Sequence, residues 1–152
     1  MAYDADPRLT ALEPLVGEWD MELRFPHGPE VGGSCSFEWT LDGRFLIQRS
    51  EVPDMPEAPG TLSMIAPDHT GDGFIQHYFD TRGVVRLYAM TVGGGELVLE
   101  RTTEDFSPLD FWQRFTGTFD QSGDRITGGW YASHAKDGEW ELDFELDYTR
   151  VG

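Results

Sequence analysis

Apolar and polar residues alternate with a period of two along most of the chain from residue 17 onward. Successive side chains of a β-strand point to opposite faces of a sheet, so this alternation predicts strands with one buried face. Clusters of Gly, Pro and Asp separate the alternating segments. The predicted strands are Gly17–Phe25, Ser34–Leu41, Arg44–Val52, Gly60–Ala66, Gly73–Asp80, Val84–Val92, Glu96–Thr103, Phe111–Phe119, Arg125–Ser133 and Glu139–Arg150.

One short helical turn is expected before the strands. Asp6 is suited to cap it, Pro7 to occupy its first position, and Leu9, Leu12 and Leu15 to lie on one side. With no helix between the strands, consecutive strands are expected to pair as antiparallel hairpins. Closure of this meander removes its two unpaired edges. We therefore predict an all-β fold: a single closed antiparallel up-and-down barrel of about ten strands in one domain, residues 1–152. A β-sandwich is the alternative.

The first and last strands divide into an apolar and a charged face. The inward residues predicted for the first strand are Trp19, Met21, Leu23 and Phe25. Those predicted for the last strand are Trp140, Leu142, Phe144, Leu146, Tyr148 and Arg150. The intervening carboxylates, Glu141, Asp143, Glu145 and Asp147, are expected to face water, since carboxylates spaced along a convex surface do not converge on a metal ion.

Turn chemistry predicts the faces of the middle strands, because a two-residue loop places its flanking residues opposite each other on one face. With two-residue loops at Arg82-Gly83 and Gly93-Gly94, the inward residues are His77, Phe79, Arg86, Tyr88, Met90 and Arg101. A three-residue loop at Gly93–Gly95 would invert this assignment. The same argument at Asp42-Gly43 places inward the residues Trp39, Leu41, Leu46 and Gln48.

The late strands are less regular. The phenylalanines favour an inward face made of Phe111, Gln113 and Phe115, which leaves Arg114 on the other face. The directions of Arg114, Trp130 and Tyr131 stay open. The turn at residues 137–138 favours Tyr131 as the inward residue, whereas the series of alternate residues from 126 to 130 favours Trp130, and a β-bulge would reconcile the two.

The net charge of the chain limits the classes of partner that it is expected to bind. The 152 residues include 28 Asp and Glu against 11 Lys and Arg, which gives a formal net charge of −17. Such a chain is repelled by nucleic acid and by anionic membrane surfaces, so neither partner is expected. The hydrophobic content of 39% is too high for a disordered acidic segment. A monomer and a homodimer both remain open.

The single cysteine, Cys35, cannot form an intramolecular disulfide, and Met1–Asp6 has neither the basic nor the apolar region of a signal peptide. A cytoplasmic location is therefore expected. Cys35 shares the apolar face of its strand with Phe37 and Trp39, so we expect a buried thiol and no nucleophile. No metal-binding or nucleophile motif appears, and no metal site is predicted.

The sequence motifs of the first and last strands resemble those of a known superfamily. Gly17-Glu18-Trp19 opens the first strand after a short turn, and Tyr148-Thr149-Arg150 closes the last. These features resemble the lipocalin and fatty-acid-binding-protein β-barrels of the calycin superfamily. There the Trp of a Gly-x-Trp motif plugs the closed end of the barrel and an Arg from the final strand stacks over it. The resemblance implies that Trp19 and Arg150 form this structural pair.

A closer similarity extends along the chain. The segments Leu41–Leu46, Gln76–Asp80 and Asp105–Pro108 are similar to an uncharacterised bacterial family of lipocalin-like proteins whose domain has no known function. This similarity implies a barrel with an interior cavity. It does not imply an activity, because one fold serves many functions.

The favoured function is the binding of a small apolar or amphipathic molecule inside the barrel. The expected apolar walls are Trp39, Phe79, Met90, Phe111, Phe115 and Phe144. The expected polar contacts are Gln48, His77, Arg86, Tyr88 and Gln113, with Arg101 as a further inward cation.

Three alternatives remain. The first is an enzyme of isomerase, cyclase or hydrolase type, with His77 as general acid or base and Arg86 or Tyr88 stabilising negative charge. The second is haem binding, because a related branch of the superfamily ligates iron through an inward His on a late strand. This chain has no His in its last strand, so no cofactor is predicted. The third is a barrel filled by its own side chains, since strand number decides whether space remains.

Overall fold

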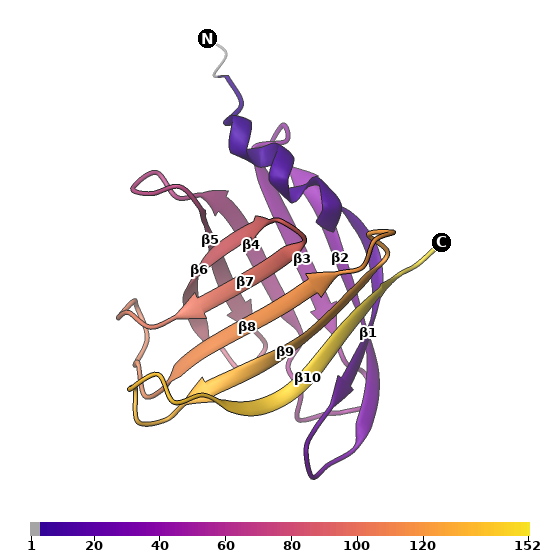
Figure 1. The fold of residues 1–152 in the computed structure, drawn as a ribbon, viewed down its shortest axis with the longest axis vertical. Helices are drawn as coiled ribbons and strands as arrows, with labels where there is room; N and C mark the ends of the chain where they lie inside the picture. Colours follow the sequence, from indigo (N-terminus) through magenta and orange to yellow (C-terminus); the bar gives the residue numbers. More distant parts are fainter. Residues whose placement is uncertain (1–3) are drawn as a thin grey trace.

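The structure is a computed structural model that describes residues 4–152. Residues 1–3, part of the Met1–Asp6 segment from which a cytoplasmic location was expected, lie outside the described residues. Ten antiparallel strands, each paired with its neighbours in the chain, form a closed barrel that β1 and β10 complete (Figure 1). The closed barrel predicted from the alternation is confirmed, and the sandwich alternative is wrong. The strands are β1 Gly17–Arg24, β2 Glu30–Thr40, β3 Phe45–Glu51, β4 Thr61–Pro67, β5 Phe74–Asp80, β6 Val85–Gly93, β7 Glu96–Arg101, β8 Trp112–Phe119, β9 Arg125–Ser133 and β10 Glu141–Arg150.

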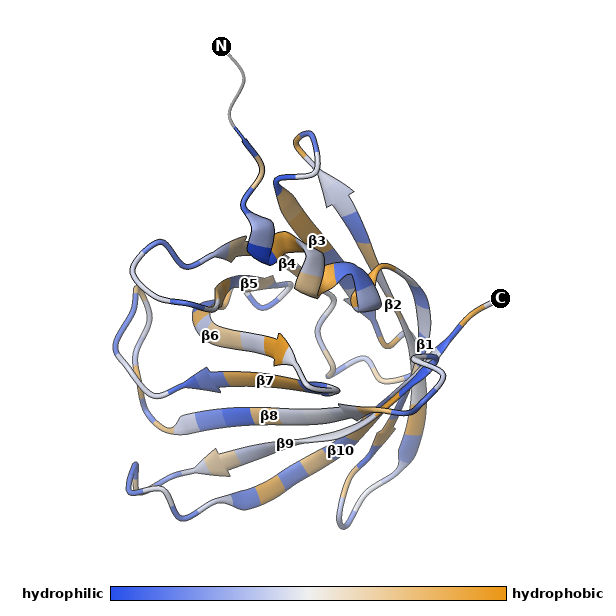
Figure 2. Ribbon diagram, turned by 45° about the horizontal axis from the view of Figure 1, so that its top comes forward, coloured by the Kyte–Doolittle hydropathy of each residue, from blue (hydrophilic) through white to orange (hydrophobic). Residues whose placement is uncertain are grey.

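The predicted helical turn is the 3₁₀ helix η1 (Pro7–Leu15), which lies at one end of the barrel (Figures 1 and 2). The Asp6 side chain accepts a hydrogen bond from the Arg8 backbone N–H and so caps the helix. The Arg8 guanidinium donates to backbone carbonyls of the β4–β5 loop, including that of Gly71 at 2.6 Å. Leu12 and Leu15 are fully buried. The helix therefore covers this end of the barrel with an apolar side.

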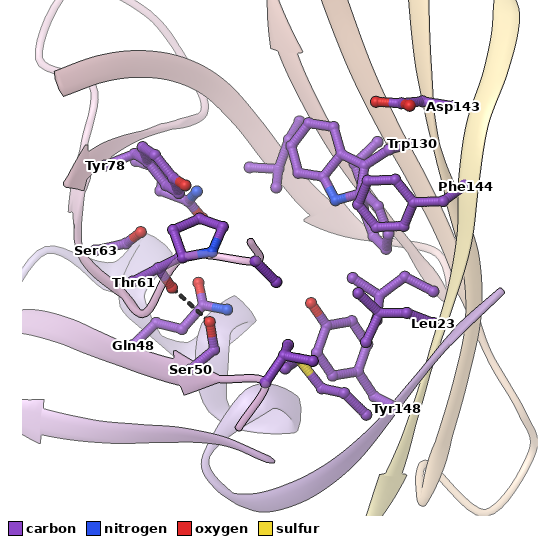
Figure 3. Close-up of a pocket in the computed structure, with 18 of the residues that line it drawn as sticks. Leu23, Gln48, Ser50, Thr61, Ser63, Tyr78, Trp130, Asp143, Phe144 and Tyr148 are labelled. Carbon is purple, nitrogen blue, oxygen red and sulfur yellow. Dashed lines mark hydrogen bonds between the residues drawn. The ribbon is translucent and has the colours of Figure 1, made fainter. Parts of the chain in front are cut away.

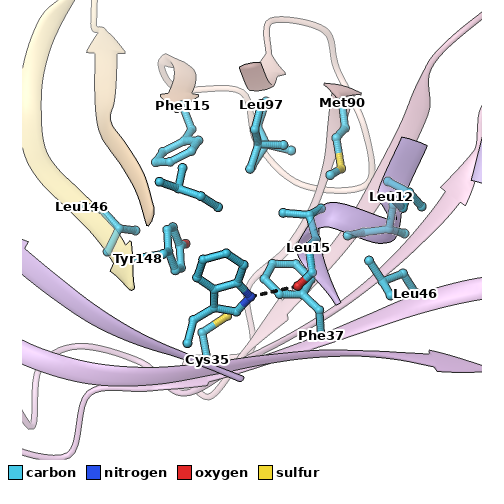
Figure 4. Packing of buried hydrophobic residues seen from close by; sticks show 14 of the residues in the cluster. Leu12, Leu15, Cys35, Phe37, Leu46, Met90, Leu97, Phe115, Leu146 and Tyr148 are labelled. Atoms are coloured by element: carbon cyan, nitrogen blue, oxygen red, sulfur yellow. Dashed lines mark hydrogen bonds between the residues drawn. The ribbon is translucent and has the colours of Figure 1, made fainter. Parts of the chain in front are cut away.

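The Trp19 side chain lies at the same end and joins η1 to the barrel. Its indole N–H donates to the Leu15 carbonyl oxygen at 2.8 Å, within a dense group of buried apolar residues (Figure 4). Arg150 covers the indole: its guanidinium carbon lies 4.1 Å from the ring centroid. The guanidinium also donates to the carbonyl oxygens of Pro14 and Val16 at 2.7 and 2.6 Å. Helix, first strand and last strand are thus joined at one point.

The loop between β5 and β6 is one residue longer than predicted. Asp80 and Val84 are bonded across it, so it holds the three residues 81–83 where two were expected. Gly83 has φ +82°, a left-handed conformation that favours glycine, and its N–H donates to the Asp80 carbonyl oxygen at 2.9 Å. Because side chains alternate between the two faces of a strand, one extra loop residue places every side chain of β5 on the face opposite to the predicted one.

The prediction that His77 and Phe79 face the barrel interior is therefore wrong. Both side chains lie on the outer face, and Phe79 is 43% exposed beside a hollow on the outside of the barrel. Gln76 and Tyr78 take the inward positions in β5. On β6, Tyr88 and Met90 are buried and inward, as predicted.

The turn after β6 shows why that strand kept its predicted faces. It is centred on Gly94-Gly95 and not on Gly93-Gly94, so Met90 pairs with Leu99 where Leu97 was expected. A shift of two positions preserves the alternation, whereas a shift of one inverts it.

A β-bulge in β10 resolves the open directions of Trp130 and Tyr131. Tyr131 pairs with Leu142 and Trp130 with Phe144, so Asp143 has no partner of its own. Trp130 faces the interior and Tyr131 the outside. Phe144, Leu146 and Tyr148 face inward as predicted.

Residues before the bulge are shifted to the other face, so the inward predictions for Trp140 and Leu142 are wrong. Leu142 is 39% exposed. Trp140 lies on the outside, where the Arg114 guanidinium carbon is 4.3 Å from its ring centroid. Arg114 also pairs with Glu100 at 2.7 Å, which places Arg114 on the outer face.

Two further expectations are corrected. Leu41 does not point inward: it lies in the β2–β3 turn with φ +50° and is 65% exposed. Asp147 is on the outer face as predicted, but its side chain is only 3% exposed. Arg24 and Arg125 each approach it to 2.9 Å and shield it from water.

Candidate ligand-binding cavity

The barrel interior is divided into a packed half and a hollow half. Near η1 it is filled by buried side chains such as those of Leu12, Leu15 and Leu46. Towards the other end lies a cavity of about 360 Å³, within the size range of small-molecule sites (Figure 3). The expectation of a barrel filled by its own side chains therefore holds for one end only.

One wall of the cavity is apolar and largely aromatic. It comes mainly from β1 and from β6 to β10, with Phe25 after β1 and Phe37 in β2, and Figure 3 shows Leu23, Trp130, Phe144 and Tyr148 on that side. The aromatic rings contact one another: the Trp130 ring centroid lies 5.4 Å from that of Phe115 and 5.5 Å from that of Tyr88. The apolar lining residues are Met21, Leu23, Phe25, Phe37, Met90, Leu97, Leu99, Phe115, Trp130, Phe144 and Leu146.

The opposite wall carries uncharged polar groups on the adjacent strands β3, β4 and β5. Gln48 is paired in register with Ser63, and Ser63 with Tyr78, so the three lie side by side across the sheet. The Ser50 and Thr61 hydroxyls are hydrogen-bonded to each other (Figure 3). Gln76 faces the cavity one alternate position from Tyr78 on the same strand. The cavity is therefore amphipathic.

Three tyrosines line the cavity and remain neutral phenols at physiological pH. Burial raises the pKa of Tyr78, Tyr88 and Tyr148 above the ordinary value of 10.0. Tyr78 donates to Asp80 at 2.8 Å, and Tyr88 donates to the Gln113 side-chain oxygen at 2.9 Å. These phenols contribute hydrogen-bonding groups without contributing charge.

The charged residues that line the cavity stand at its exposed rim. They are Glu57 in the β3–β4 loop, Arg82 in the β5–β6 loop and Asp143 in the bulge of β10. Arg82 is paired with the Asp80 carboxylate at 2.6 Å. The proline-rich β3–β4 loop also contributes Met55 and Ala58 to the lining, so this loop covers part of the opening.

The predicted binding residues divide into three groups. Gln48, Tyr88, Met90, Phe115 and Phe144 line the cavity. A second group, Trp39, Arg86, Phe111 and Gln113, is outside the lining of the cavity. The third group, His77 and Phe79, lies on the outer face. The catalytic role of His77 was argued from an interior position, which the structure does not give it.

Arg86 is held beside the barrel end by neighbouring side chains. It donates to the Gln113 side-chain oxygen at 3.2 Å, and its guanidinium carbon lies 5.7 Å from the Phe111 ring centroid. Its Nε is buried and has no hydrogen-bond partner among residues 4–152. Phe111 precedes β8 and also packs against His134. Trp39 faces inward from β2 but packs against the core instead of lining the cavity.

Arg101 forms a buried ion pair within the protein. Its guanidinium and the Asp105 carboxylate are 2.8 Å apart, with side-chain exposures of 1% and 3%. It also donates to the carbonyl oxygens of Ser107 and Pro108. Asp105 in turn accepts from the Leu87 backbone N–H at 2.9 Å. This ion pair ties the β7–β8 loop to the barrel end and neutralises the Arg101 guanidinium, whose Nε and Nη2 make these bonds.

Sequence reasoning missed several cavity residues, among them Ser63, Gln76 and Tyr78, and it left the direction of Trp130 open. Gln76 and Tyr78 were missed because of the one-residue error in the β5–β6 loop. The run of Asp80, Arg82 and Gly83 carried a usable signal, since the Asp80 side chain accepts from the backbone N–H groups of Arg82 and Val84 and shapes a longer loop.

The lining does not fit a haem ligated by imidazole, because none of the residues that line the cavity is a histidine. Among residues 4–152 no group of three or more His, Cys, Asp or Glu side chains is placed to hold a metal ion. Over the same residues, no helix has the length and apolar character needed to cross a membrane.

No family model and no curated protein matches the chain. Among solved structures, the chain is similar to the crystal structure of Rv2717c from M. tuberculosis. The TM-score is 0.64 at 15% sequence identity, over 98% of this chain and 100% of that one. This similarity concerns the fold alone, a closed barrel of ten antiparallel strands in the described residues of this chain.

Proposed function

We propose that the protein binds a small amphipathic molecule in the barrel interior. The observation that carries the proposal is the cavity of about 360 Å³, with an aromatic wall facing a polar one. Apolar lining with a few convergent polar groups is the usual character of small-molecule sites. Its position supports the same conclusion, since it lies away from the end that η1 covers and is bordered by loops.

We also propose the family and setting in which this function operates. The terminal Gly-x-Trp and Arg features support a single domain of the lipocalin and fatty-acid-binding-protein group, related to the uncharacterised bacterial lipocalin-like family. The lone, buried Cys35 and the strongly acidic composition support a cytoplasmic binding protein. No nucleic acid or membrane partner is proposed.

The test is a fluorescence titration with N-phenyl-1-naphthylamine, an uncharged probe that brightens in apolar surroundings. Ala58 lines the cavity from the β3–β4 loop, so Ala58→Trp is expected to obstruct it and to weaken probe binding at least about tenfold. Ala89 is exposed on β6, and Ala89→Trp serves as the matched control with unchanged binding. Absence of saturable binding to the wild-type protein, or equal binding by both variants, contradicts the proposal.

A further inference from the structure

Two polar side chains in the cavity wall have no partner within the protein. Ser63 is 1% exposed and Gln76 is 4% exposed. Both line the cavity, and among residues 4–152 neither side chain takes part in a hydrogen bond. Their polar atoms are open to the cavity, where a bound molecule can supply the hydrogen bonds that the protein does not.

The two groups form one polar site on neighbouring strands. Ser63 is paired in register with Tyr78, and Gln76 is the next inward residue on the same strand as Tyr78. Gln48 borders Ser63 on the other side, where its amide donates weakly to the Cys35 sulfur at 3.4 Å. A carboxamide both donates and accepts, and a hydroxyl does the same. The site can therefore satisfy a ligand group that donates, accepts or does both.

The polar site holds no charge that could neutralise an ionic ligand. Every lining residue away from the rim is apolar or uncharged, because burial raises the pKa of the lining tyrosines and keeps them neutral. A carboxylate or ammonium placed there loses its hydration without gaining an opposite charge, which is costly. At the rim, Arg82 is paired with Asp80, and the other charges, Glu57 and Asp143, are carboxylates that repel anions.

The buried arginines near this end do not supply the missing charge. Arg101 is paired with Asp105 and bonded to two loop carbonyls. Arg86 lies outside the cavity lining, bonded to Gln113 and stacked on Phe111. Arg86 is paired in register with Tyr78 at the border of the polar wall, but neither Arg86 nor Arg101 lines the cavity, where recognition of a carboxylate would require a guanidinium.

Resting on the proposed binding function, we propose that the ligand is an uncharged aromatic molecule with a neutral hydrogen-bonding group such as a carboxamide, ketone or hydroxyl. That group meets Ser63 and Gln76, and the ring system packs against Phe115, Trp130 and Phe144. Offset and edge-to-face ring contacts suit this aromatic wall. Free carboxylic acids and amines are excluded from the same position.

The experiment compares three probes with one ring skeleton, measured by displacement of N-phenyl-1-naphthylamine from the full chain. They are 2-naphthamide, which is neutral, 2-naphthoate, an anion, and 2-naphthylmethylammonium, a cation. We expect 2-naphthamide to bind at least about tenfold more tightly than either ion. Equal or tighter binding of the anion or the cation would overturn the inference.

A pair of variants tests the polar site. Gln76→Leu removes the amide at nearly constant volume, and binding of 2-naphthamide is expected to weaken about fivefold relative to binding of N-phenyl-1-naphthylamine. Gln121 is exposed in the β8–β9 loop, so Gln121→Leu is the matched control with unchanged binding of both probes. Unchanged 2-naphthamide binding in a folded Gln76→Leu protein, checked by circular dichroism, contradicts the assignment of this site.

The two proposals fail in distinguishable ways. If N-phenyl-1-naphthylamine does not bind the wild-type protein, the binding function itself is wrong. If it binds but 2-naphthamide has no advantage over the ions, the cavity is a binding site for a different ligand class and only the present inference is lost.

Discussion

The Arg150 guanidinium carbon lies 4.1 Å from the centroid of the Trp19 indole ring, although 130 positions of sequence separate the two residues. Arg150 ends the last strand and Trp19 lies near the start of the first, and the two are paired in register where the barrel closes. The guanidinium also bonds to carbonyl oxygens of Pro14 and Val16. The contact therefore secures the closure of the sheet and the position of the N-terminal helix.

Removal of the Arg150 charge is expected to destabilise the barrel. Arg150→Met keeps much of the apolar stem but loses the cation–π contact and the hydrogen bonds, so the free energy of unfolding should fall by about 2 kcal/mol. Guanidinium chloride unfolding measures this. Arg49, in an exposed pair with Glu38, provides the control: Arg49→Met should change the free energy by less than about 0.5 kcal/mol. Equal effects of the two variants would show that the closure contact contributes no special stability.

Gly17 is expected to be intolerant of a side chain. It has φ +130°, and a Cβ at this position would lie 2.8 Å from Arg150 Nη1. Gly17→Ala should therefore lower the free energy of unfolding by about 1–3 kcal/mol. At Gly93 a Cβ meets open space, and Gly93→Ala should be nearly neutral by the same chemical unfolding assay. A neutral Gly17→Ala would mean that Arg150 moves aside at no cost.

The buried ion pair of Arg101 and Asp105 is expected to contribute to stability in a pH-dependent way. Hydrogen bonds from Arg101 hold the pKa of Asp105 far below its ordinary value of 3.8. Asp105→Asn leaves Arg101 buried without a counter-charge, so the free energy of unfolding at pH 7 should fall by about 3–5 kcal/mol.

The sign of the pH effect follows from the lowered pKa. The contribution of Asp105 is complete above the pKa of the unfolded chain, near 3.8, and is lost as the pH falls towards the lower pKa of the folded state. The difference between wild type and Asp105→Asn should be constant from about pH 7 to 5 and narrow below about pH 4. A constant difference down to pH 2 would contradict this linkage.

The outward position of His77 makes a direct prediction about binding. His77→Ala should leave the affinity for N-phenyl-1-naphthylamine within about twofold, because its side chain does not reach the cavity. Phe144 lines the cavity, and Phe144→Ala should weaken binding about tenfold through loss of apolar contact. Loss of binding in His77→Ala with Phe144→Ala unaffected would restore an interior role for the histidine.

The Cys35 thiol is expected to be unreactive in the native protein. It is 3% exposed, and burial raises its pKa to about 12, so the reactive thiolate is scarce at pH 8. Native protein should react with Ellman's reagent only slowly, and protein unfolded in guanidinium chloride should react at once with one thiol per chain. Rapid reaction of the native protein would indicate that the strand around Cys35 opens.

Local pattern was sufficient for much of the architecture. The alternation identified all ten strands, and the Asp42-Gly43 turn correctly predicted that Gln48 faces the interior. The inward positions of Tyr88 and Phe115 followed in the same way. These predictions succeeded because burying one face of a strand imposes a period of two that the residues themselves display.

Errors arose where one residue more or less in a turn or bulge inverts a whole strand. Because the loop before Val84 has three residues, Gln76 and Tyr78 face the interior in place of His77. The bulge at Asp143 places Trp140 and Leu142 on the outer face. The sequence near each of these points is compatible with both registers. Pairing with the neighbouring strands selects one of them, and that selection depends on contacts across the barrel.

The sequence by itself therefore determined the strand pattern, the closed barrel, the strong negative charge and the apolar character of the interior. Only the tertiary structure decided that η1 and the Trp19 region fill one half of the barrel and that a cavity occupies the other. It also decided that Ser63 and Gln76 lie on the same wall of the cavity and that Asp105 neutralises the charge of Arg101. The physical reason is that alternation assigns a residue to a face, whereas volume, register and charge pairing depend on residues far apart in the chain.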